Sequence, residues 1–284
     1  MDDATASAKS GYADLQAHIG ALDKAGLLHR IDAEVNKDTE LHALVRWQFR
    51  GGIPERERKA FLFTNIVDAK GRKFDMPVVV GALAANSQIY SIGMNVPLDE
   101  IGPAWQNAVA NPINPVEVST APCQEVVLEG SDIDGEGKGL DALPVPISSP
   151  GFDSAPYLTA GNFVTRDPEN GIQNMGTYRG GLKSPTRMAV RMSTRHGGAG
   201  GYPHWEKYKA KGEKMPCAVV LGCPPAVAYM GPQKMPLDTD ELSIAGGLAG
   251  EPIRIVKCKT IDLMVPADAE IIIEGLIDTE YLEP

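Results

Sequence analysis

The sequence predicts an α+β protein in which an N-terminal α/β domain, residues 1–115, is followed by a strand-rich domain, residues 116–284. Helical and strand-like patterns alternate over residues 11–110. Prolines and glycines then crowd residues 111–155, as expected of loops around a domain boundary. Strand-like runs dominate the remainder of the chain. A length of 284 residues is sufficient for two such domains, at roughly 100–200 residues each.

Helices are predicted in the N-terminal domain over residues 11–22, 38–50 and 97–110. The first helix carries a single apolar stripe, formed by Tyr12, Leu15, Ile19 and Leu22. In the second helix, Asp38 or Thr39 is expected to be the N-cap. Its inward-facing side chains are predicted to be Leu41, Leu44 and Val45. The histidines in or beside these helices are interpreted as surface or interface residues: His18, His29 and His42.

Strands are predicted wherever short apolar runs end at turn residues. In the N-terminal domain, residues 61–67 and 76–83 are rich in β-branched side chains and suit a sheet covered on both faces. In the second domain the strand-like segments are 157–167, 172–182, 187–194, 217–222, 253–258 and 269–277. Short helices interrupt them at residues 203–211 and 240–248. This order predicts an antiparallel sheet or barrel.

Composition excludes several classes of function. The 27 basic and 37 acidic residues give a net charge of −10, which argues against a general nucleic-acid binder. No apolar run approaches the 18–20 residues of a membrane span, and the acidic N-terminus does not resemble a signal peptide. The four cysteines lack metal-binding spacing and are interpreted as buried thiols of a cytoplasmic protein.

Glycine-rich segments suggest nucleotide sites, but their details exclude the known motifs. In GEGKGL, Leu140 stands where the dinucleotide-binding motif needs its last glycine, and no strand precedes the segment. In GTYRGGLKS, Leu182 separates the glycines from Lys183, and Pro185 opposes the helix that would hold a phosphate. The nucleophile elbow of serine hydrolases, G-x-S-x-G, is also missing.

The stretch NMGTYRGGL, residues 174–182, is predicted to be a strand but carries an unusual number of polar side chains. Alternation places Asn174 and Tyr178 on one face and Thr177 and Arg179 on the other. If Asn174 and Arg179 serve one site, the strand must therefore bulge or end between them, as the neighbouring glycines permit.

Two further residues have both a structural and a functional interpretation. His196 lies in a glycine-rich loop, where it is either an ordinary loop residue or part of an anion site with bare backbone around it. Glu241 begins a helix, where a carboxylate complements the helix dipole. The sequence Ala245-Gly246-Gly247 indicates that this helix packs closely against another element.

Considered together, three segments resemble the UbiD family of aromatic-acid and enoic-acid decarboxylases. They are RDPENGIQNMGTYR (166–179), RMAVRMSTRHGG (187–198) and the segment 240–275, which contains AGGLAG and VPADAEIIIEG. Their order and spacing also fit the family, and the resemblance covers nearly the whole chain. It implies that the strand-rich domain is a flavin-binding split β-barrel.

The resemblance also implies cofactors and site residues. The family uses prenylated FMN, Mn²⁺ or Mg²⁺, and K⁺, and a hard cation suits oxygen ligands. The expected metal ligands are Asn174, His196 and Glu241. The expected cofactor-binding residues are Thr177, Tyr178, Arg179, Arg191, Met192, Ser193, His196 and Gly197. Arg179 is also the expected catalytic residue, because it matches the arginine that contacts the substrate carboxylate, which a guanidinium binds bidentately.

The implied reaction is the reversible, non-oxidative loss of CO₂ from an aromatic or α,β-unsaturated carboxylic acid, in a protein that is a homo-oligomer at full length. Family members are nearly twice as long, and the segment with their catalytic carboxylates and C-terminal domain is expected beyond residue 284. Two alternatives therefore stay open. One is a non-catalytic cofactor-binding module that needs another segment to supply the carboxylates, and the other is an FMN reductase with a split barrel.

Overall fold

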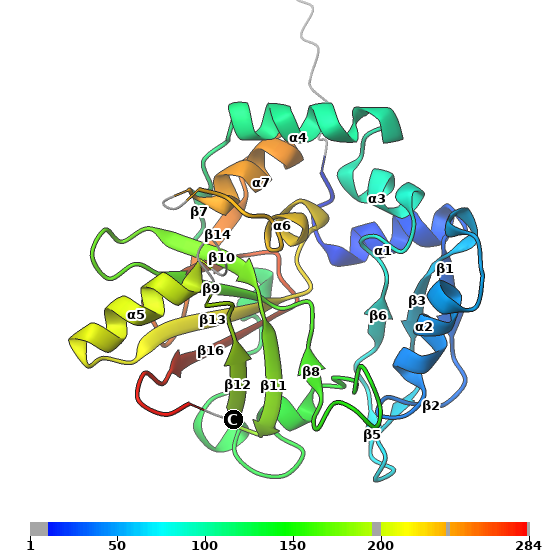
Figure 1. Ribbon diagram of the computed structural model, residues 1–284, viewed down its shortest axis with the longest axis horizontal. Coiled ribbons are helices and arrows are strands. Elements are labelled where there is room, and N and C mark those ends of the chain that lie inside the picture. The colour runs from blue at the N-terminus through cyan, green and yellow to red at the C-terminus, as the bar shows by residue number, and fades with distance from the viewer. Residues whose placement is uncertain (1–10, 195–199, 237–238, 283–284) are drawn as a thin grey trace, which may run out of the picture.

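The computed structural model describes residues 11–194, 200–236 and 239–282 (Figure 1). It shows a mixed α/β fold. The N-terminal region, in blue and cyan, lies beside a strand-rich region that runs from green to red. The described strands form one four-stranded and four three-stranded sheets. The helices α4 (Ile101–Ala110) and α7 (Glu241–Ala249) stack above the strand-rich region.

The N-terminal region contains two small sheets with strand orders β1-β3-β6 and β2-β4-β5. Its strands are β1 (Leu28–Ile31), β2 (Val35–Asn36), β3 (Ala60–Phe63), β4 (Ile66–Val67), β5 (Lys73–Phe74) and β6 (Val78–Val80). Besides α4, its helices are α1 (Leu15–Lys24), α2 (Leu41–Arg50) and α3 (Ser87–Met94). Strands β1 and β3 pair in parallel, and β3 and β6 antiparallel.

Three expectations for this region are wrong. The N-cap of α2 is Glu40, not Asp38 or Thr39, and no side chain caps the helix. Leu44 is 48% exposed, because Leu41 and Val45 set the phase of the buried face of α2. His18 is fully buried in α1 rather than at the surface. Helix α3 was not expected, although Asn86 caps it by accepting a hydrogen bond from the Ile89 N–H at 2.7 Å.

The strand-rich region contains the sheets β10-β9-β13-β16, β12-β11-β8 and β15-β14-β7. Its strands are β7 (Val116–Glu117), β8 (Tyr157–Leu158), β9 (Asn162–Arg166), β10 (Gln173–Thr177), β11 (Arg179–Ser184), β12 (Arg187–Arg191), β13 (Met215–Leu221), β14 (Arg254–Lys257), β15 (Met264–Pro266) and β16 (Ile271–Ile277). Its helices are α5 (Gly201–Lys211), α6 (Pro225–Met230) and α7. The first two sheets are antiparallel throughout, as expected.

These sheets are open at their edges, and the described residues do not form a closed barrel. The segment expected as one strand at residues 172–182 is two strands that belong to different sheets. Strand β10 ends at Thr177 and β11 begins at Arg179, so the chain changes sheets at Tyr178. The strand thus ends between Asn174 and Arg179, which is what a shared site requires.

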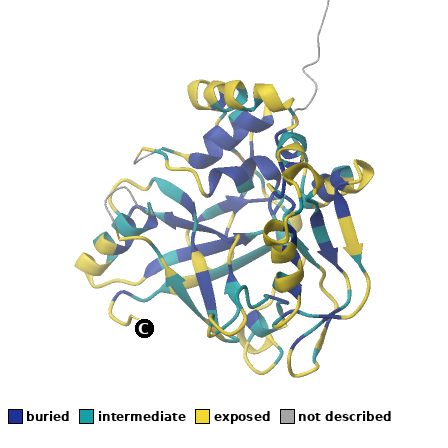
Figure 2. Cartoon of the chain, turned by 45° about the vertical axis from the view of Figure 1, so that its right-hand side comes forward, coloured by how far each residue is buried: buried dark blue, intermediate teal, exposed yellow. Residues whose placement is uncertain are grey.

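Helix α7 is almost entirely buried beneath α4, whose outer face is exposed (Figure 2). The close packing expected at Ala245-Gly246-Gly247 is confirmed. A Cβ at Gly247 would lie 2.9 Å from the Ala108 Cα of α4, and one at Gly246 would collide with the Ile113 carbonyl. The two helices can approach only because these positions carry no side chain. This contact fixes the start of α7, where Glu241 lies.

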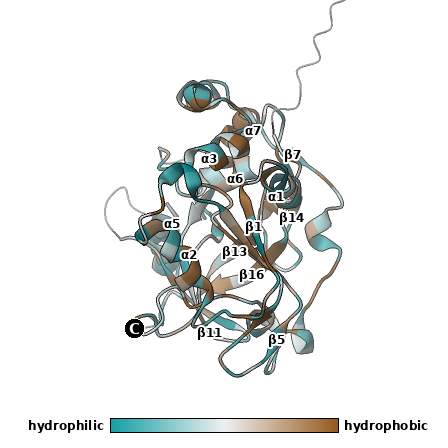
Figure 3. Cartoon of the chain, turned by 90° about the vertical axis from the view of Figure 1, so that its right-hand side faces the viewer, coloured by the Kyte–Doolittle hydropathy of each residue, from teal (hydrophilic) through white to brown (hydrophobic). Residues whose placement is uncertain are grey.

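The largest hydrophobic core joins both regions of the chain. It includes Met94 and Ala108 from the N-terminal helices and Val164, Val220 and Met230 from the strand-rich region. Hydrophobic colour accordingly concentrates on the central strands β13 and β16, and hydrophilic colour on outer helices and loops (Figure 3). Helix α6 also contributes to this core, although the sequence predicted no helix there and Pro225 is its first residue. Proline is nevertheless well tolerated in the first turn of a helix.

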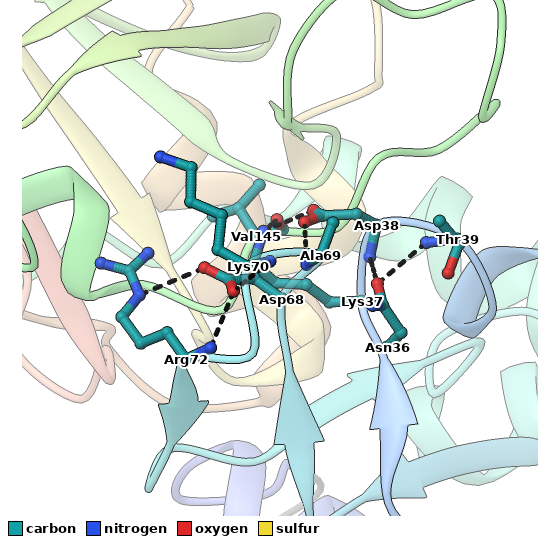
Figure 4. Close-up of polar contacts among 9 residues, drawn as sticks. All are labelled: Asn36, Lys37, Asp38, Thr39, Asp68, Ala69, Lys70, Arg72 and Val145. Carbon is teal, nitrogen blue, oxygen red and sulfur yellow. Dashed lines mark hydrogen bonds and ion pairs between the residues drawn. The ribbon is translucent and has the colours of Figure 1, made fainter.

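A buried polar cluster attaches the N-terminal region to the loop before β8 (Figure 4). Lys37 is 5% exposed; its ammonium group lies 2.6 Å from the Asp38 carboxylate and donates to the Val145 carbonyl at 3.0 Å. Asp38 in turn accepts from the Ala69 N–H at 3.0 Å. Every charge in this chain of contacts therefore has a partner of opposite polarity.

None of the helices in the described part of the chain has both the length and the hydrophobicity of a membrane span.

Candidate functional site

The junction between β10 and β11 brings several of the predicted site residues together. Tyr178 is 8% exposed, and its phenol oxygen accepts hydrogen bonds from the Asn174 amide at 3.1 Å and the Gly201 N–H at 2.9 Å. Asn174 and Tyr178 thus lie on the same side of the strand, as alternation predicts. Burial raises the pKa of Tyr178, with the two donated hydrogen bonds acting in the opposite direction. The phenol is therefore a neutral anchor that fixes the orientation of Asn174.

Glu241 reaches this junction from the first turn of α7. Its side chain is buried, and one carboxylate oxygen accepts a hydrogen bond from the Met175 N–H at 3.1 Å. Met175 directly follows Asn174 in the sequence, so the Glu241 carboxylate contacts the backbone next to the residue that carries the carboxamide. Asp240 is the N-cap and accepts from the Leu242 N–H at 3.0 Å, which leaves Glu241 free of the capping role.

The environment of Glu241 is unfavourable for an isolated charge. Burial raises its pKa to about 7, and the hydrogen bonds from backbone N–H groups only partly oppose this. A buried carboxylate without a cation is costly, and a bound metal ion removes that cost. The oxygen of Asn174 and the carboxylate of Glu241 are ligands that a hard cation such as Mn²⁺ or Mg²⁺ accepts. The two residues therefore fit the expected metal.

The third expected metal ligand cannot be placed. His196 and Gly197 lie outside the described residues. Within the described part of the chain, no group of three His, Cys, Asp or Glu side chains could hold a metal ion. Of the three expected metal ligands, the described residues contain only Asn174 and Glu241.

The polar groups of Thr177 form hydrogen bonds within the protein. Its hydroxyl donates to the Asn162 side-chain oxygen at 2.7 Å, and its N–H donates to the Gly231 carbonyl at 2.9 Å. A Cβ at Gly231 would collide with both Asn162 and Thr177. Thr177 therefore fastens the end of β10 to the segment that follows α6, and Asn162 and Gly231 are site-supporting residues that sequence reasoning missed.

Arg179 and Arg191 face each other across the β11–β12 pair, where they are directly opposite in register. Both side chains are exposed, and among the described residues neither guanidinium has a hydrogen-bonding or ion-pair partner. Met192 is half-buried and would lie 3.2 Å from a Cβ at Gly201, whereas Ser193 is exposed. The two arginines are thus placed beside the Asn174–Glu241 junction without a counter-charge.

The glycine-rich loop has a role that the sequence did not identify. A Cβ at Gly200 would collide with the Asn174 carboxamide, so the bare backbone approaches a site side chain. Next to it, buried Thr165 forms a 2.9 Å hydrogen bond with the His204 ring, which holds α5 against β9. The glycines themselves were the available signal, but the group that they approach could not be read from them.

A separate cavity of about 590 Å³ lies between the edge strands β12 and β16. Apolar side chains from β12, β13 and β16 form most of its wall, including Met188, Val219 and Ile273. Of the described residues assigned to the site from the sequence, Arg191, Asn174 and Glu241 do not line it, while Met192 does. The cavity therefore lies next to the junction and is not part of it.

Comparison with known families assigns both regions of the chain. The family model described as the 3-octaprenyl-4-hydroxybenzoate carboxy-lyase Rift-related domain of UbiD matches residues 114–284. The chain belongs to the UbiD family. The model of the UbiD N-terminal domain also matches, over residues 19–109.

Known relatives extend this assignment. An uncharacterized protein of Synechocystis is 32% identical over 295 residues, covering 95% of this chain and 55% of that protein. An evolved dimeric form of the UbiD-class enzyme HmfF from Pelotomaculum thermopropionicum, solved in complex with prFMN, is similar with a TM-score of 0.80 at 30% identity. That match covers 93% of this chain and 57% of the enzyme.

The vanillic acid decarboxylase of Sedimentibacter hydroxybenzoicus, in its closed form, has a TM-score of 0.81 at 26% identity. The match covers 93% of this chain and 55% of that enzyme. The chain thus spans a little over half the length of these relatives. HmfF has been solved in complex with prFMN and in complex with FMN.

Proposed function

We propose that this chain carries the cofactor-binding half of a prenylated-FMN-dependent carboxy-lyase that acts on an aromatic or α,β-unsaturated carboxylic acid. The observation that carries the proposal is the hydrogen bond from the Met175 N–H, next to Asn174 in the chain, to buried Glu241. The Asn174 side-chain oxygen and the Glu241 carboxylate, whose pKa is raised, are ligand types that suit a divalent cation. His196 is proposed as the third ligand.

The cofactor would lie along the residues around this cation. We assign to its site the residues Thr177, Tyr178, Arg179, Arg191, Met192, Ser193, His196 and Gly197, of which Arg179 and Arg191 are neighbours on the β11–β12 pair. When bound, the prenylated flavin supplies an electron sink for the loss of CO₂. Asn174, Glu241 and His196 would hold the divalent cation, K⁺ would be a second cation, and the residues around them would orient the flavin and exclude water.

Arg179 is proposed as the residue that binds the substrate carboxylate. Its guanidinium is exposed at the start of β11 and has no acidic partner among the described residues, so it is available for a ligand. A guanidinium holds a carboxylate by two parallel hydrogen bonds and thereby fixes the bond to be broken. A segment like the remainder of the longer relatives would supply the proton that replaces CO₂.

The proposed organisation is an N-terminal α/β domain at residues 1–115 and a split β-barrel that binds the flavin at residues 116–284. Two open antiparallel sheets, β10-β9-β13-β16 and β12-β11-β8, support the split-barrel assignment. The full-length protein is proposed to be a homo-oligomer, since a dimeric form is known for HmfF.

Metal and flavin binding test this function directly. The chain should bind Mn²⁺ and prenylated FMN together, as measured by isothermal titration and by the flavin absorption spectrum. Asn174→Ala and Glu241→Gln should each weaken Mn²⁺ binding by about tenfold or more, since even outer partners of metal ligands contribute 10–100-fold. The matched control is Glu125→Gln, at an exposed carboxylate that is not among the proposed site residues.

Equal Mn²⁺ affinity in all three variants would contradict the metal site. CO₂ release from a panel of aromatic and enoic acids by the loaded chain separates the two functional hypotheses. Turnover by residues 1–284 alone favours a complete catalyst. Flavin and metal binding without turnover favours a cofactor-binding module.

A further inference from the structure

The outer face of the β11–β12 pair carries two positive charges at one register position. Arg179 and Arg191 are directly opposite, so their side chains leave the same face of the sheet. Like charges opposite each other destabilise a strand pair. Several other cations of the strand-rich region are compensated: Arg166 contacts Asp262, Arg254 contacts Asp268, and Lys207 contacts Asp167.

The uncompensated pair is unexpected for this composition. The chain has 37 acidic against 27 basic residues, yet no described acid pairs with Arg179 or Arg191. Two guanidinium groups side by side form a fork that matches one carboxylate from two directions. The placement therefore predicts an anionic ligand between the two strands.

An aromatic side chain lies two positions along the same face. Tyr157 of β8 is opposite Gly181 of β11, and a Cβ at Gly181 would be 2.8 Å from the Tyr157 ring. The tyrosine ring therefore covers the bare backbone of Gly181, and Ala189 is opposite Gly181 on the other side. Two residues along a strand span about 7 Å, which is the reach of a benzoate from its carboxylate across its ring.

The opposite face of these strands is apolar. Leu158, Val190 and Met188 point toward the core that contains Phe163 and Tyr178, and Met188 and Val190 also line the neighbouring cavity. The face with the arginines and Tyr157 is therefore the one on which these strands offer cations to a carboxylate. That face combines a double cation with a small, flat, aromatic-walled surface.

We propose that Arg191 is a second carboxylate-binding residue that acts with Arg179, and that Tyr157 over Gly181 forms a subsite for the ring of an aromatic acid. This inference rests on the proposed function for its meaning as a substrate site, and it makes Arg191 and Tyr157 specificity-determining residues. It selects aromatic over small acyclic acids within the proposed substrate class.

Ligand binding without flavin, metal or turnover tests the site. The probes are benzoate, its uncharged isostere benzamide, and the acyclic acid crotonate, titrated into the 284-residue chain at low salt with ligand-observed NMR. Benzoate should bind about tenfold or more tightly than benzamide, because a charge-assisted bidentate contact is among the strongest hydrogen-bonding arrangements. Arg191→Gln should lower benzoate affinity by about the same factor.

The control is Arg187→Gln, which removes the same charge from the far end of β12 and should change benzoate affinity less than twofold. Tyr157→Ala should weaken benzoate several-fold and leave crotonate unchanged. Arg191→Lys keeps the positive charge but loses the planar guanidinium, so it tests whether bidentate geometry contributes beyond charge. Circular dichroism checks that each variant is folded.

Equal benzoate affinity in the wild-type chain and Arg191→Gln would overturn the inference, as would an equal loss in Arg187→Gln. These outcomes are independent of the proposed function. If Mn²⁺ and prenylated FMN bind normally while Arg191→Gln keeps full benzoate affinity, only this inference fails. If the chain does not bind flavin but the benzoate results hold, only the carboxy-lyase assignment fails.

Discussion

Two groups of charged side chains in this molecule are built in opposite ways. In the Lys37 cluster of the N-terminal region, a buried ammonium meets Asp38 and the Val145 carbonyl, and Asp68 meets Arg72 (Figure 4). At the junction of β10, β11 and α7, buried Glu241 has no cationic partner among the described residues, and Arg179 and Arg191 have no acid.

The pKa values report the same contrast. Burial alone would raise the pKa of Asp68, but hydrogen bonds from the Arg72 and Lys70 N–H groups, with the nearby cations Arg72 and Lys37, outweigh it and lower the pKa. Burial dominates for Glu241 and raises its pKa to about 7. A compensated cluster stabilises the fold by itself. An uncompensated one lowers stability until a ligand arrives, which is the pattern expected of a binding site.

The largest effect is expected from breaking the compensated cluster. Lys37→Met leaves the Asp38 carboxylate and the Val145 carbonyl without their partner, and should lower the free energy of unfolding by about 3 kcal/mol. Urea denaturation measures the change. Lys70→Met, on an exposed position of the neighbouring turn, is the control and should be near neutral. If both variants unfold at the same urea concentration, the cluster does not stabilise the fold as described.

The opposite sign is expected at the site. The folded-state pKa of Glu241, about 7, lies above its unfolded value, so its contribution to stability is present below about pH 4.5 and is lost as the pH rises through 7. Glu241→Gln removes the buried charge, and should therefore raise the free energy of unfolding of the metal-free chain by about 1–3 kcal/mol at pH 8.

Urea denaturation at pH 8 and pH 5 checks this, and the gain should shrink at pH 5, where the carboxyl group is protonated. Glu125→Gln is the control at an exposed position. A Glu241→Gln variant less stable than wild type at pH 8 would show that the carboxylate is compensated after all.

The sequence anticipated the components of the site better than their arrangement. Alternation placed Asn174 with Tyr178, and the family motifs pointed to Glu241. The glycines permitted a break between Asn174 and Arg179, but they did not show that β10 and β11 enter different sheets, because strand pairing is decided by partners distant in sequence. The same holds for the register that sets Arg179 opposite Arg191. Burial of His18 and exposure of Leu44 depended on how α1 and α2 are rotated against the sheets, which periodicity fixes only approximately.

The smallest effect is expected from His18, whose stability profile should slope in the opposite direction to that of Glu241. Its Nε2–H donates to the Ala82 carbonyl at 2.6 Å, and Nδ1 is buried without a hydrogen-bond partner. Burial lowers the pKa of His18, against the influence of that hydrogen bond. The folded state therefore resists protonation, and the stability that the neutral ring contributes above about pH 6.5 is lost as the pH falls below that value.

Replacing His18 by Gln should flatten the fall in stability between pH 7 and pH 5 by about 1 kcal/mol, given a limit of about 1.4 kcal/mol per pH unit for one proton. Urea titrations at several pH values measure this slope, which is informative even if the variant is less stable throughout. His29→Gln, on an exposed position of β1, should flatten it less. If the His18→Gln and wild-type profiles run parallel, the buried ring titrates as it does in the unfolded chain. Opposite changes in slope for His18→Gln and Glu241→Gln would instead show that each region carries its own pH-dependent charge. Only the charge of Glu241 should then respond to added Mn²⁺.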